Sequence, residues 1–394
     1  MLAANFPRRI LFGQGSIEFI ATLKAKRAFC IVDTVFHQFN PQLFAELEAI
    51  FKKQGTAYHV CFGQGQEPTL EYVQESAVAM REFGPDCIIA IGGGSVLDAA
   101  KVMEVYYEHP DITLEQLSDR FNLPPIRRKA KFVAVPTTSG TGSEVTAVAV
   151  LYVPSGNPDM PYVKRGIADV QLIPDYVILD PSYTLTMPAS ITAATGLDAF
   201  VHAIEGYVSN KPANAFADGF ALEAMKKVVT YLPKVLKEPD NLEYRSEMQI
   251  AATMGGLELA SRASGASHGM GKQLATLKPM PHGTSVSMML PQVVRANASV
   301  RMKEYAEIAR YLGVKAKSDD EAVEGLLDII ETMLASAKCP RTIADIGLDK
   351  GVFLKNIDLL IKNSQNDAAM KGNPREYSVE EIRGVFLTLL PENA

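Results

Sequence analysis

Two residues that can bind a metal or a proton lie one helical turn apart in the middle of this 394-residue chain. Asp198 and His202 belong to the stretch TGLDAFVHAIEGY (195–207), whose apolar residues predict a helix. Positions i and i+4 share a helix face, so both side chains should point in the same direction. Burying either one without a partner is expensive. These residues alone leave two interpretations open, an internal hydrogen bond or a metal site.

Two further histidines extend the metal interpretation. His268 lies in ASHGMGKQLA, among small residues that let helices approach closely, and His282 lies in PMPHGTS, in or beside a loop. With Asp198 and His202 they would supply three nitrogens and one oxygen, a set that suits Zn(II) or Fe(II) and leaves room for a substrate oxygen. Spacing alone does not show that the four converge. We interpret the remaining histidines as structural: His37, His59 and His109.

Two glycine-rich loops after apolar strands predict a phosphate-binding site. Gly92-Gly93-Gly94-Ser95 follow CIIAI and open an amphipathic segment, and TTSGTGSE (137–144) repeats the pattern of a strand followed by glycines. Glycines let the backbone approach an anion, and a helix N-terminus offers free N–H groups. The first loop is not the GxGxxG fingerprint, so an ordinary Rossmann assignment would be wrong in detail. A tight turn between strand and helix is the alternative.

Asp33 ends an early strand, AFCIVDT (28–34). A carboxylate at such a position commonly bonds the hydroxyls of an adenosine ribose and repels a 2′-phosphate, which favours NAD over NADP. A loop aspartate that caps a turn is the alternative.

The elements that must position these residues change character near residue 180. Before it, short strands alternate with helices, which predicts a parallel sheet covered on both faces. After it, helical patterns follow one another without a convincing strand. We therefore predict an α/β, Rossmann-like dinucleotide-binding domain (1–183) and an all-helical metal-binding and catalytic domain (184–394). The expected strands begin at 28, 56, 87 and 130, and the expected helices span 41–55, 69–84, 189–207, 214–237, 243–262, 301–313, 319–336 and 378–390.

Composition excludes several classes of protein. The formal net charge is −6, so no bulk basic character would drive nucleic-acid binding. No apolar run approaches the roughly 20 residues that cross a bilayer. The four cysteines are scattered, and we interpret them as reduced residues of the core. The first residues lack the apolar segment and cleavage site of a signal peptide. We therefore expect a cytoplasmic protein with no membrane or nucleic-acid partner.

Taken together, these segments resemble the iron-containing (group III) alcohol dehydrogenase family. The resemblance covers essentially the whole chain, and its motifs are highly specific in this order and spacing. They are Phe12–Ser16, IGGGSVLDAAK (91–101), VPTTSGTGSEVT (135–146), Lys164, PDYVILDPSYTLTMP (174–188), TAATGLDAFVHAIEGYVS (192–209), His268, Pro281-His282-Gly283 and Asn373-Pro374-Arg375.

The resemblance implies a metal-dependent, NAD(H)-linked alcohol dehydrogenase or aldehyde reductase with a dehydroquinate synthase-like architecture. Asp198, His202, His268 and His282 would bind one catalytic divalent ion, Fe(II) or Zn(II), acting as a Lewis acid. The dinucleotide would meet it in the cleft between the domains. Homo-oligomers, often dimers, are implied as well. The residues expected to line the dinucleotide site are Asp33, Gly92, Gly93, Gly94, Ser95, Asp98, Thr137, Thr138, Thr141, Ser143 and Lys164.

Lys272 departs from the family pattern. Many members carry another histidine four residues after the third ligand, facing the substrate, and here that position is Lys272. One hypothesis is that Lys272, with Lys278 and Arg262 nearby in sequence, reads an anionic tail on a short aldehyde such as sulfoacetaldehyde or succinic semialdehyde. The alternative is a polar replacement or proton carrier in an enzyme for neutral short-chain alcohols or diols.

Two readings from other classes stay open. One is a lyase that uses NAD transiently, similar to dehydroquinate synthases, which net NADH turnover would separate from a dehydrogenase. The other is a non-catalytic, filament-forming domain like the dehydrogenase half of bifunctional aldehyde–alcohol dehydrogenases, which light scattering would test.

Overall fold

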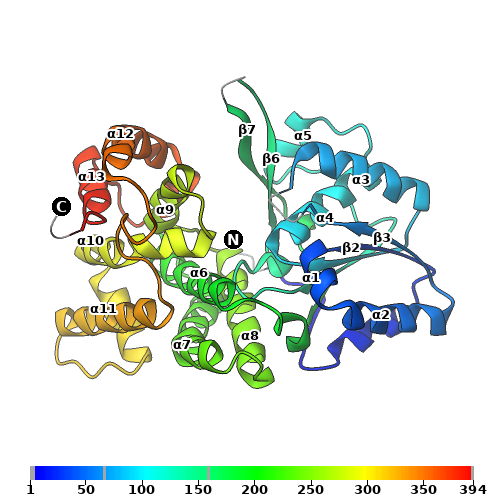
Figure 1. Cartoon of the computed structure of the whole chain (residues 1–394), viewed down its shortest axis with the longest axis horizontal. Coiled ribbons are helices and arrows are strands. Elements are labelled where there is room, and N and C mark those ends of the chain that lie inside the picture. Colours follow the sequence, from blue (N-terminus) through cyan, green and yellow to red (C-terminus); the bar gives the residue numbers. More distant parts are fainter. Residues whose placement is uncertain (1–4, 65–67, 158–159, 392–394) are drawn as a thin grey trace. The chain divides into compact units, whose positions relative to one another are not determined.

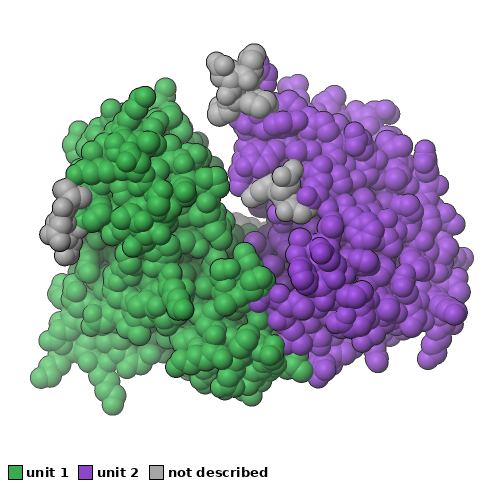
Figure 2. All heavy atoms as spheres, in the orientation of Figure 1, with its two compact units in different colours: residues 1–4, 188–394 green, residues 5–187 purple. Residues whose placement is uncertain are grey.

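The computed structural model of the chain describes residues 5–64, 68–157 and 160–391. These divide into two compact units, residues 5–187 and the residues from Pro188 onward, which Figure 2 colours separately. The sequence predicted a boundary between residues 183 and 184. No helix among the described residues is long and apolar enough to cross a membrane.

The first unit is built on a six-stranded parallel sheet (Figure 1). The strand order is β1-β8-β5-β4-β2-β3, so β4 and β5, the strands that precede the two glycine loops, are neighbours near its centre. The predicted fold class is confirmed. The strands are β1 (Arg9–Phe12), β2 (Arg27–Val32), β3 (Ala57–Phe62), β4 (Cys87–Gly92), β5 (Lys131–Pro136) and β8 (Tyr176–Leu179).

Both faces of this sheet are buried, which explains why its central strands are continuous apolar runs. All six residues of β4 are buried. Alternate residues of β2, β4 and β5 pack into two separate cores, one with α3 and α4 and the other with α2 and the short helix η1 (Ser16–Leu23). The helices of this unit are α1 (Thr34–Phe39), α2 (Pro41–Gln54), α3 (Leu70–Phe83), α4 (Gly94–Glu108) and α5 (Leu114–Ser118).

A two-stranded antiparallel hairpin lies outside the main sheet and was not predicted. It pairs β6 (Val148–Asn157) with β7 (Met160–Ala168). The segment carries Pro154, and proline argues against a central strand because it cannot donate to a ladder. In a two-stranded sheet each strand is an edge strand, and edge strands accept such residues.

The second unit is helical, and its described residues contain no strand. Its core cluster draws residues from each of the helices α6 to α13, which Figure 1 labels. The helices are α6 (Ala189–Val208), α7 (Ala215–Lys237), α8 (Leu242–Leu259), α9 (Ala266–Leu277), α10 (His282–Tyr311), α11 (Asp319–Ser336), α12 (Lys350–Asn366) and α13 (Val379–Leu387).

Three helices of this unit depart from the sequence-based expectation: α9 and α12 have no counterpart among the expected helices, and α10 begins earlier than expected. A helix was expected at 301–313, but α10 already begins at His282 and contains Pro291. Proline inside a helix normally breaks or kinks it, which is why the first half escaped the pattern. Arg301 has a non-helical backbone (φ −132°, ψ 32°), so the expected helix is the part that follows this kink. His282 is therefore the first residue of a helix, beside the loop in which or next to which it was predicted.

Candidate metal centre and dinucleotide loops

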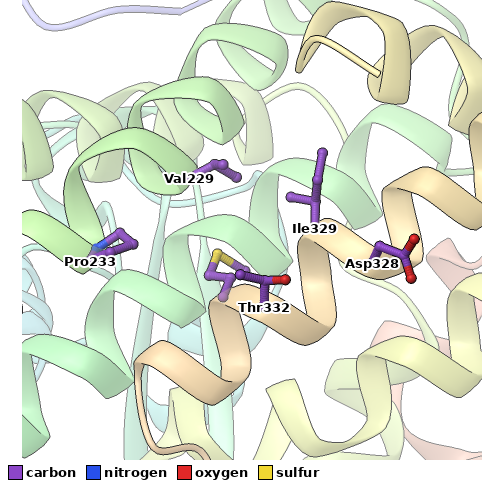
Figure 3. A pocket seen from close by; sticks show the side chains of 6 residues that line it. Val229, Pro233, Asp328, Ile329 and Thr332 are labelled. Carbon is purple, nitrogen blue, oxygen red and sulfur yellow. The ribbon is translucent and has the colours of Figure 1, made fainter. Parts of the chain in front are cut away.

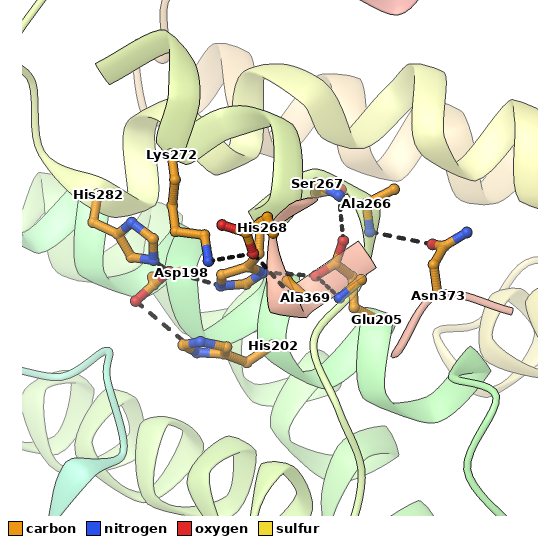
Figure 4. Close-up of polar contacts among 12 residues, drawn as sticks. Asp198, His202, Glu205, Ala266, Ser267, His268, Lys272, His282, Ala369 and Asn373 are labelled. Atoms are coloured by element: carbon orange, nitrogen blue, oxygen red, sulfur yellow. Dashed lines mark hydrogen bonds and ion pairs between the residues drawn. The ribbon is translucent and has the colours of Figure 1, made fainter. Parts of the chain in front are cut away.

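Three side chains from three helices of the second unit converge on one point (Figure 4). Asp198 comes from α6, His268 from α9 and His282 from α10, and their ligand atoms all lie within 4.8 Å of one another. Asp198 Oδ1 is 3.7 Å from Nε2 of each histidine. Carboxylate oxygen and imidazole nitrogen are ligands that Zn(II) and Fe(II) accept. The grouping is one a divalent ion can bridge.

His202 lies beside this group without entering it. Its ring stacks on His268 with centroids 4.5 Å apart, and its Nδ1 is 3.9 Å from Asp198 Oδ2. The predicted i and i+4 relation to Asp198 on α6 is present. The structure therefore brings all four predicted ligands together, with three of them sharing a common centre.

Glu205 orients His268. Its carboxylate lies 2.6 Å from His268 Nδ1 and also accepts hydrogen bonds from the backbone N–H groups of Gly265 and Ser267. A carboxylate at Nδ1 favours the proton of the neutral ring on that nitrogen, so Nε2 is the nitrogen whose lone pair a bound ion would take. This is the arrangement typical of a metal-binding histidine.

The electrostatics of the group favour a cation. Burial alone would raise the pKa of Asp198, but the imidazoles of His202, His282 and His268 hold it below its ordinary value. Burial would likewise lower the pKa of His268, but Glu205 and Asp198 outweigh burial and raise it to about 9. The two carboxylates thus concentrate negative charge in a buried place.

Two buried polar atoms in this group lack a hydrogen-bond partner among the described residues. They are Asp198 Oδ1 and His268 Nε2. Orphaned buried polar atoms are costly and rare in folded proteins. Both face the point where a shared ion would be bound, so the residues present fit a metal.

Glycines allow the three helices to approach closely. A β-carbon on Gly283 of α10 would lie 1.9 Å from the Ala194 carbonyl oxygen of α6, and one on Gly271 of α9 would lie 2.5 Å from the Val286 Cα of α10. Both neighbours are backbone atoms that cannot rotate away. The helices that carry Asp198, His268 and His282 therefore meet through positions where only glycine fits.

Lys272 lies one turn after His268 on α9 (Figure 4). Its Nζ donates to Asp367 Oδ1 at 2.7 Å, and the same oxygen accepts from the Ala369 N–H. The charge of Lys272 is therefore matched by a neighbouring carboxylate. Arg262 points elsewhere, since its guanidinium bonds Asp218 and three backbone carbonyls around residues 207–212.

The two glycine loops of the first unit lie against each other. A β-carbon on Gly94 would be 2.9 Å from the Thr141 hydroxyl, and one on Gly93 would be 3.4 Å from the Thr138 hydroxyl. The Thr137 N–H donates to the Gly92 carbonyl. Gly93 is the N-cap of α4. Residues 137–144, which we call the threonine loop, therefore lie at a helix N-terminus. Both loops follow the carboxyl ends of adjacent parallel strands, where α/β sheets bind ligands.

The other predicted dinucleotide residues occupy different places. Ser95 lies in the first turn of α4. Asp33 is the N-cap of α1, and its Oδ1 accepts from the Phe36 N–H at 2.8 Å. Lys164 lies on β7, with its Nζ 5.5 Å from the ring centroid of Tyr152.

Asp98 and Ser143 are bonded to each other. The Ser143 hydroxyl donates to Asp98 Oδ1 at 2.5 Å, and Asp98 Oδ2 accepts from the Val150 N–H at 2.8 Å. These contacts join α4 to the segment after the threonine loop.

Sequence reasoning missed two carboxylates that bond side chains of α9, Glu205 at His268 and Asp367 at Lys272. Glu205 is seven residues after Asp198 on the same predicted helix, so helical spacing could have placed it on the same face. Asp367 offered no such signal, because it lies 95 residues from Lys272.

A shallow hollow between α7 and α11 contains no comparable chemistry (Figure 3). Its volume is about 230 Å³, and its lining includes Val229, Pro233 and Ile329 with one carboxylate, Asp328. It has none of the candidate ligands.

Family models match both units. The model described as iron-containing alcohol dehydrogenase matches residues 7–181, and the C-terminal model of the Fe-containing alcohol dehydrogenase family matches residues 192–390. The chain is 32% identical to the NADPH-dependent butanol dehydrogenase of Clostridium saccharobutylicum, across 98% of this chain and 97% of that protein. It is 36% identical to the bifunctional aldehyde–alcohol dehydrogenase of Escherichia coli, across 98% of this chain but 46% of that protein.

Solved structures are similar to this chain over nearly its whole length. The iron-containing alcohol dehydrogenase of Thermococcus thioreducens has a TM-score of 0.86 at 30% identity, with 99% of each chain covered. A sulfoacetaldehyde reductase from Bifidobacterium kashiwanohense in complex with NAD⁺ has a TM-score of 0.85 at 25% identity, with 100% of this chain and 99% of that chain covered.

Proposed function

Because this chain belongs to the iron-containing alcohol dehydrogenase family, we propose that it interconverts a small alcohol and its aldehyde with NAD(H) and one divalent ion, Fe(II) or Zn(II). The observation that carries the proposal is the pair of orphaned buried atoms, Asp198 Oδ1 and His268 Nε2, grouped with His282. His202 is the fourth proposed ligand. When bound, the ion supplies a Lewis acid for the substrate oxygen and the nicotinamide exchanges the hydride.

The chain's own residues prepare the metal centre. Asp198 contributes the buried negative charge. Glu205 holds a proton on His268 Nδ1, so that Nε2 is the nitrogen that would give its lone pair to the ion. The close packing of α6, α9 and α10 keeps Asp198, His268 and His282 near one another.

The first unit is proposed to bind the dinucleotide. Gly92 to Ser95 and the loop carrying Thr137, Thr138 and Thr141 would offer backbone N–H groups and hydroxyls to the pyrophosphate at the N-terminus of α4. Asp33 would bond the ribose. Asp98 and Ser143 bond each other, which supports a role in shaping the loop, and Lys164 on the hairpin is kept as a candidate contact.

The ion pair of Lys272 supports a neutral substrate. An anionic tail needs an unmatched cation, but Asp367 Oδ1 already lies 2.7 Å from Lys272 Nζ. We therefore favour a neutral short-chain alcohol or diol over an anionic aldehyde as the substrate class.

The test compares two four-carbon aldehydes, butyraldehyde and succinic semialdehyde, in NADH oxidation by the metal-loaded enzyme. We expect butyraldehyde to give the higher kcat/KM. A strong preference for the anion that Lys272→Ala abolishes would instead establish the anionic reading. Absence of net NADH turnover with every aldehyde would favour the lyase alternative.

The choice of coenzyme is tested at Asp33. Asn at this position keeps an oxygen to cap α1 but removes the negative charge. We expect wild type to prefer NADH, and Asp33→Asn to raise the ratio of NADPH to NADH efficiency roughly tenfold, since like-charge repulsion is lost. Equal ratios in both proteins would remove Asp33 from the ribose site.

A further inference from the structure

Lys101 on α4 is a lysine with no exposed surface. Its Nζ donates to four oxygens: Ser143 Oγ at 3.0 Å, the Thr146 carbonyl at 3.0 Å, Thr146 Oγ1 at 3.2 Å and the Val148 carbonyl at 2.8 Å. Lysine is almost never fully buried unless it is paired, because desolvating an ammonium is costly. Four acceptors around one ammonium explain why this burial is tolerated.

All four acceptors belong to one short segment, residues 143–148, which leads from the threonine loop into β6. Asp98, one turn earlier on α4, bonds the same segment through Ser143 Oγ and also accepts from the N–H of Val150, two residues beyond it. The Asp98 carboxylate is 3.8 Å from the Lys101 ammonium. Lys101 and Asp98, which are one turn apart on α4, therefore both bind this segment.

The charge of Lys101 is retained near neutral pH. Burial lowers its pKa to about 8, against the opposing effect of Asp98 and Glu144, while Arg127 adds to the lowering. Below that pH the ammonium keeps its protons, and each contact to it is a charge-assisted hydrogen bond.

Helix α4 therefore contacts the threonine loop at two places along its length. Its first turn touches the loop through Gly93 and Gly94, which lie against Thr138 and Thr141. Two turns later Lys101 holds the end of the same loop. With both ends held by one helix, the loop has little freedom to move away from the glycines.

We propose that Lys101 is a positioning residue of the dinucleotide site, an internal cation that holds residues 143–148 and thereby keeps the threonine loop against the glycine loop. It does not touch the dinucleotide. The inference rests on the proposed function, because it assigns the two loops to dinucleotide binding.

The experiment is chemical rescue of NADH binding. Lys101→Ala removes a side chain whose missing part is matched by n-propylammonium. We expect the Kd for NADH, measured by fluorescence titration, to rise roughly tenfold to a hundredfold, in line with lost hydrogen bonds to a charged group. Adding n-propylammonium should restore it. Tetramethylammonium, which has the charge but no N–H groups, should not.

The matched control is Lys129→Ala, which removes an exposed lysine of the same unit that bonds only the Tyr107 carbonyl and rests on the Tyr107 ring. Its Kd for NADH should equal that of wild type. The metal affinity of Lys101→Ala should also stay unchanged, since the candidate ligands lie in the other unit. If Lys101→Ala does not fold, Lys101→Met keeps the apolar stem and should still weaken NADH binding.

The outcomes separate the two proposals. Wild type that fails to bind NADH overturns the dinucleotide assignment and this inference with it. Wild type that binds NADH, with both Lys101 variants within twofold of it, overturns the role of Lys101 alone. Loss of fold and of binding in both Lys101 variants assigns Lys101 to stability only and also overturns the inference.

Discussion

Glu205 determines which nitrogen of His268 is available in the candidate metal centre. It is fully buried, and its carboxylate is satisfied by the His268 ring and two backbone N–H groups. Burial alone would raise the pKa of Glu205, but His268 and the N–H groups of Gly265 and Ser267 lower it. Glu205 therefore stays ionised and fixes the histidine.

Replacing Glu205 with Gln should weaken metal binding without removing a ligand. The amide can place an N–H where the carboxylate accepted one, so the His268 tautomer is no longer enforced. We expect the affinity for Zn(II) or Fe(II) to fall by about 10- to 100-fold in a chelator competition. Glu243→Gln, at an exposed position in the first turn of α8, is the control and should bind metal as wild type does. Equal affinities in all three proteins would contradict the assignment.

Glu258 on α8 makes a second residue-scale prediction. It is fully buried, neither carboxylate oxygen has a hydrogen-bond partner among the described residues, and burial raises its pKa well above the ordinary value. The folded state therefore binds more protons than the unfolded state once the pH exceeds the ordinary glutamate pKa. By linkage, the free energy of unfolding should fall as the pH rises from there toward the folded-state pKa.

The variant Glu258→Gln removes this titration. Urea unfolding of wild type and variant between pH 5 and 8 should show a declining free energy of unfolding in wild type and a flatter profile in the variant. The variant should therefore gain on wild type at the alkaline end. Parallel pH profiles would show that Glu258 is ionised in the folded protein.

At the scale of elements, the metal centre depends on helices that approach more closely than ordinary side chains permit. Gly271 and Gly283 lie at the contacts of α10 with α9 and α6. Because α10 begins at His282, and not at residue 301 as expected, His282 lies close to Asp198 and His268. A local helix boundary thus decides whether the ligand set is complete.

Gly271→Ala should destabilise the protein and weaken its metal centre together. The added carbon would meet backbone atoms of Ser285 and Val286, and overpacking of this kind costs about 1–3 kcal/mol. We expect a lower Tm and weaker metal binding, because His268 and His282 lie on the helices that are pushed apart. Thermal unfolding and metal titration measure both effects.

Gly219→Ala is the matched control on α7. Nothing lies within 4 Å of the position of its new β-carbon, so the change should stabilise the helix by up to about 1 kcal/mol and leave metal binding unaltered. If both alanine variants behave alike, the close approach at Gly271 is not what holds α9 to α10.

At the scale of the whole molecule, the two proposed ligands belong to different compact units. The candidate metal ligands all lie beyond Pro188, and the two glycine loops lie within residues 5–187. Each unit has its own buried clusters. A ligand that binds only the folded state stabilises what it binds by mass action, about 2.7 kcal/mol at a hundred times its Kd.

Hydrogen exchange followed by mass spectrometry should therefore separate the two ligands. Adding Zn(II) to metal-free protein should slow exchange mainly in α6, α9 and the first turns of α10. Adding NADH should slow it mainly in residues 92–100 and 137–148. Protection of residues 137–148 by metal alone, equal to that given by NADH, would contradict the assignment of the ligands to separate units.

The homodimer and the cytoplasmic location stay predictions. The molecular mass of the protein in solution would test whether it forms a homodimer.

Three features of this protein could be predicted from the sequence alone. Hydrophobic periodicity gave the alternation of strands and helices and then the run of helices, because burial on one or both faces is a local property of the pattern. The pairing of Asp198 with His202 followed from helical spacing, and the order of the motifs was sufficient for the resemblance to the iron-containing alcohol dehydrogenase family.

Tertiary structure alone decided the rest. Asp367 meets Lys272 across 95 residues, and Lys101 meets the 143–148 segment across more than forty, so no local period reports either contact. The convergence of His268 and His282 on Asp198 required α10 to begin at His282 and two glycines to admit neighbouring backbones. Such contacts depend on how whole helices pack. The spacing of residues along the sequence does not tell how close two packed helices come.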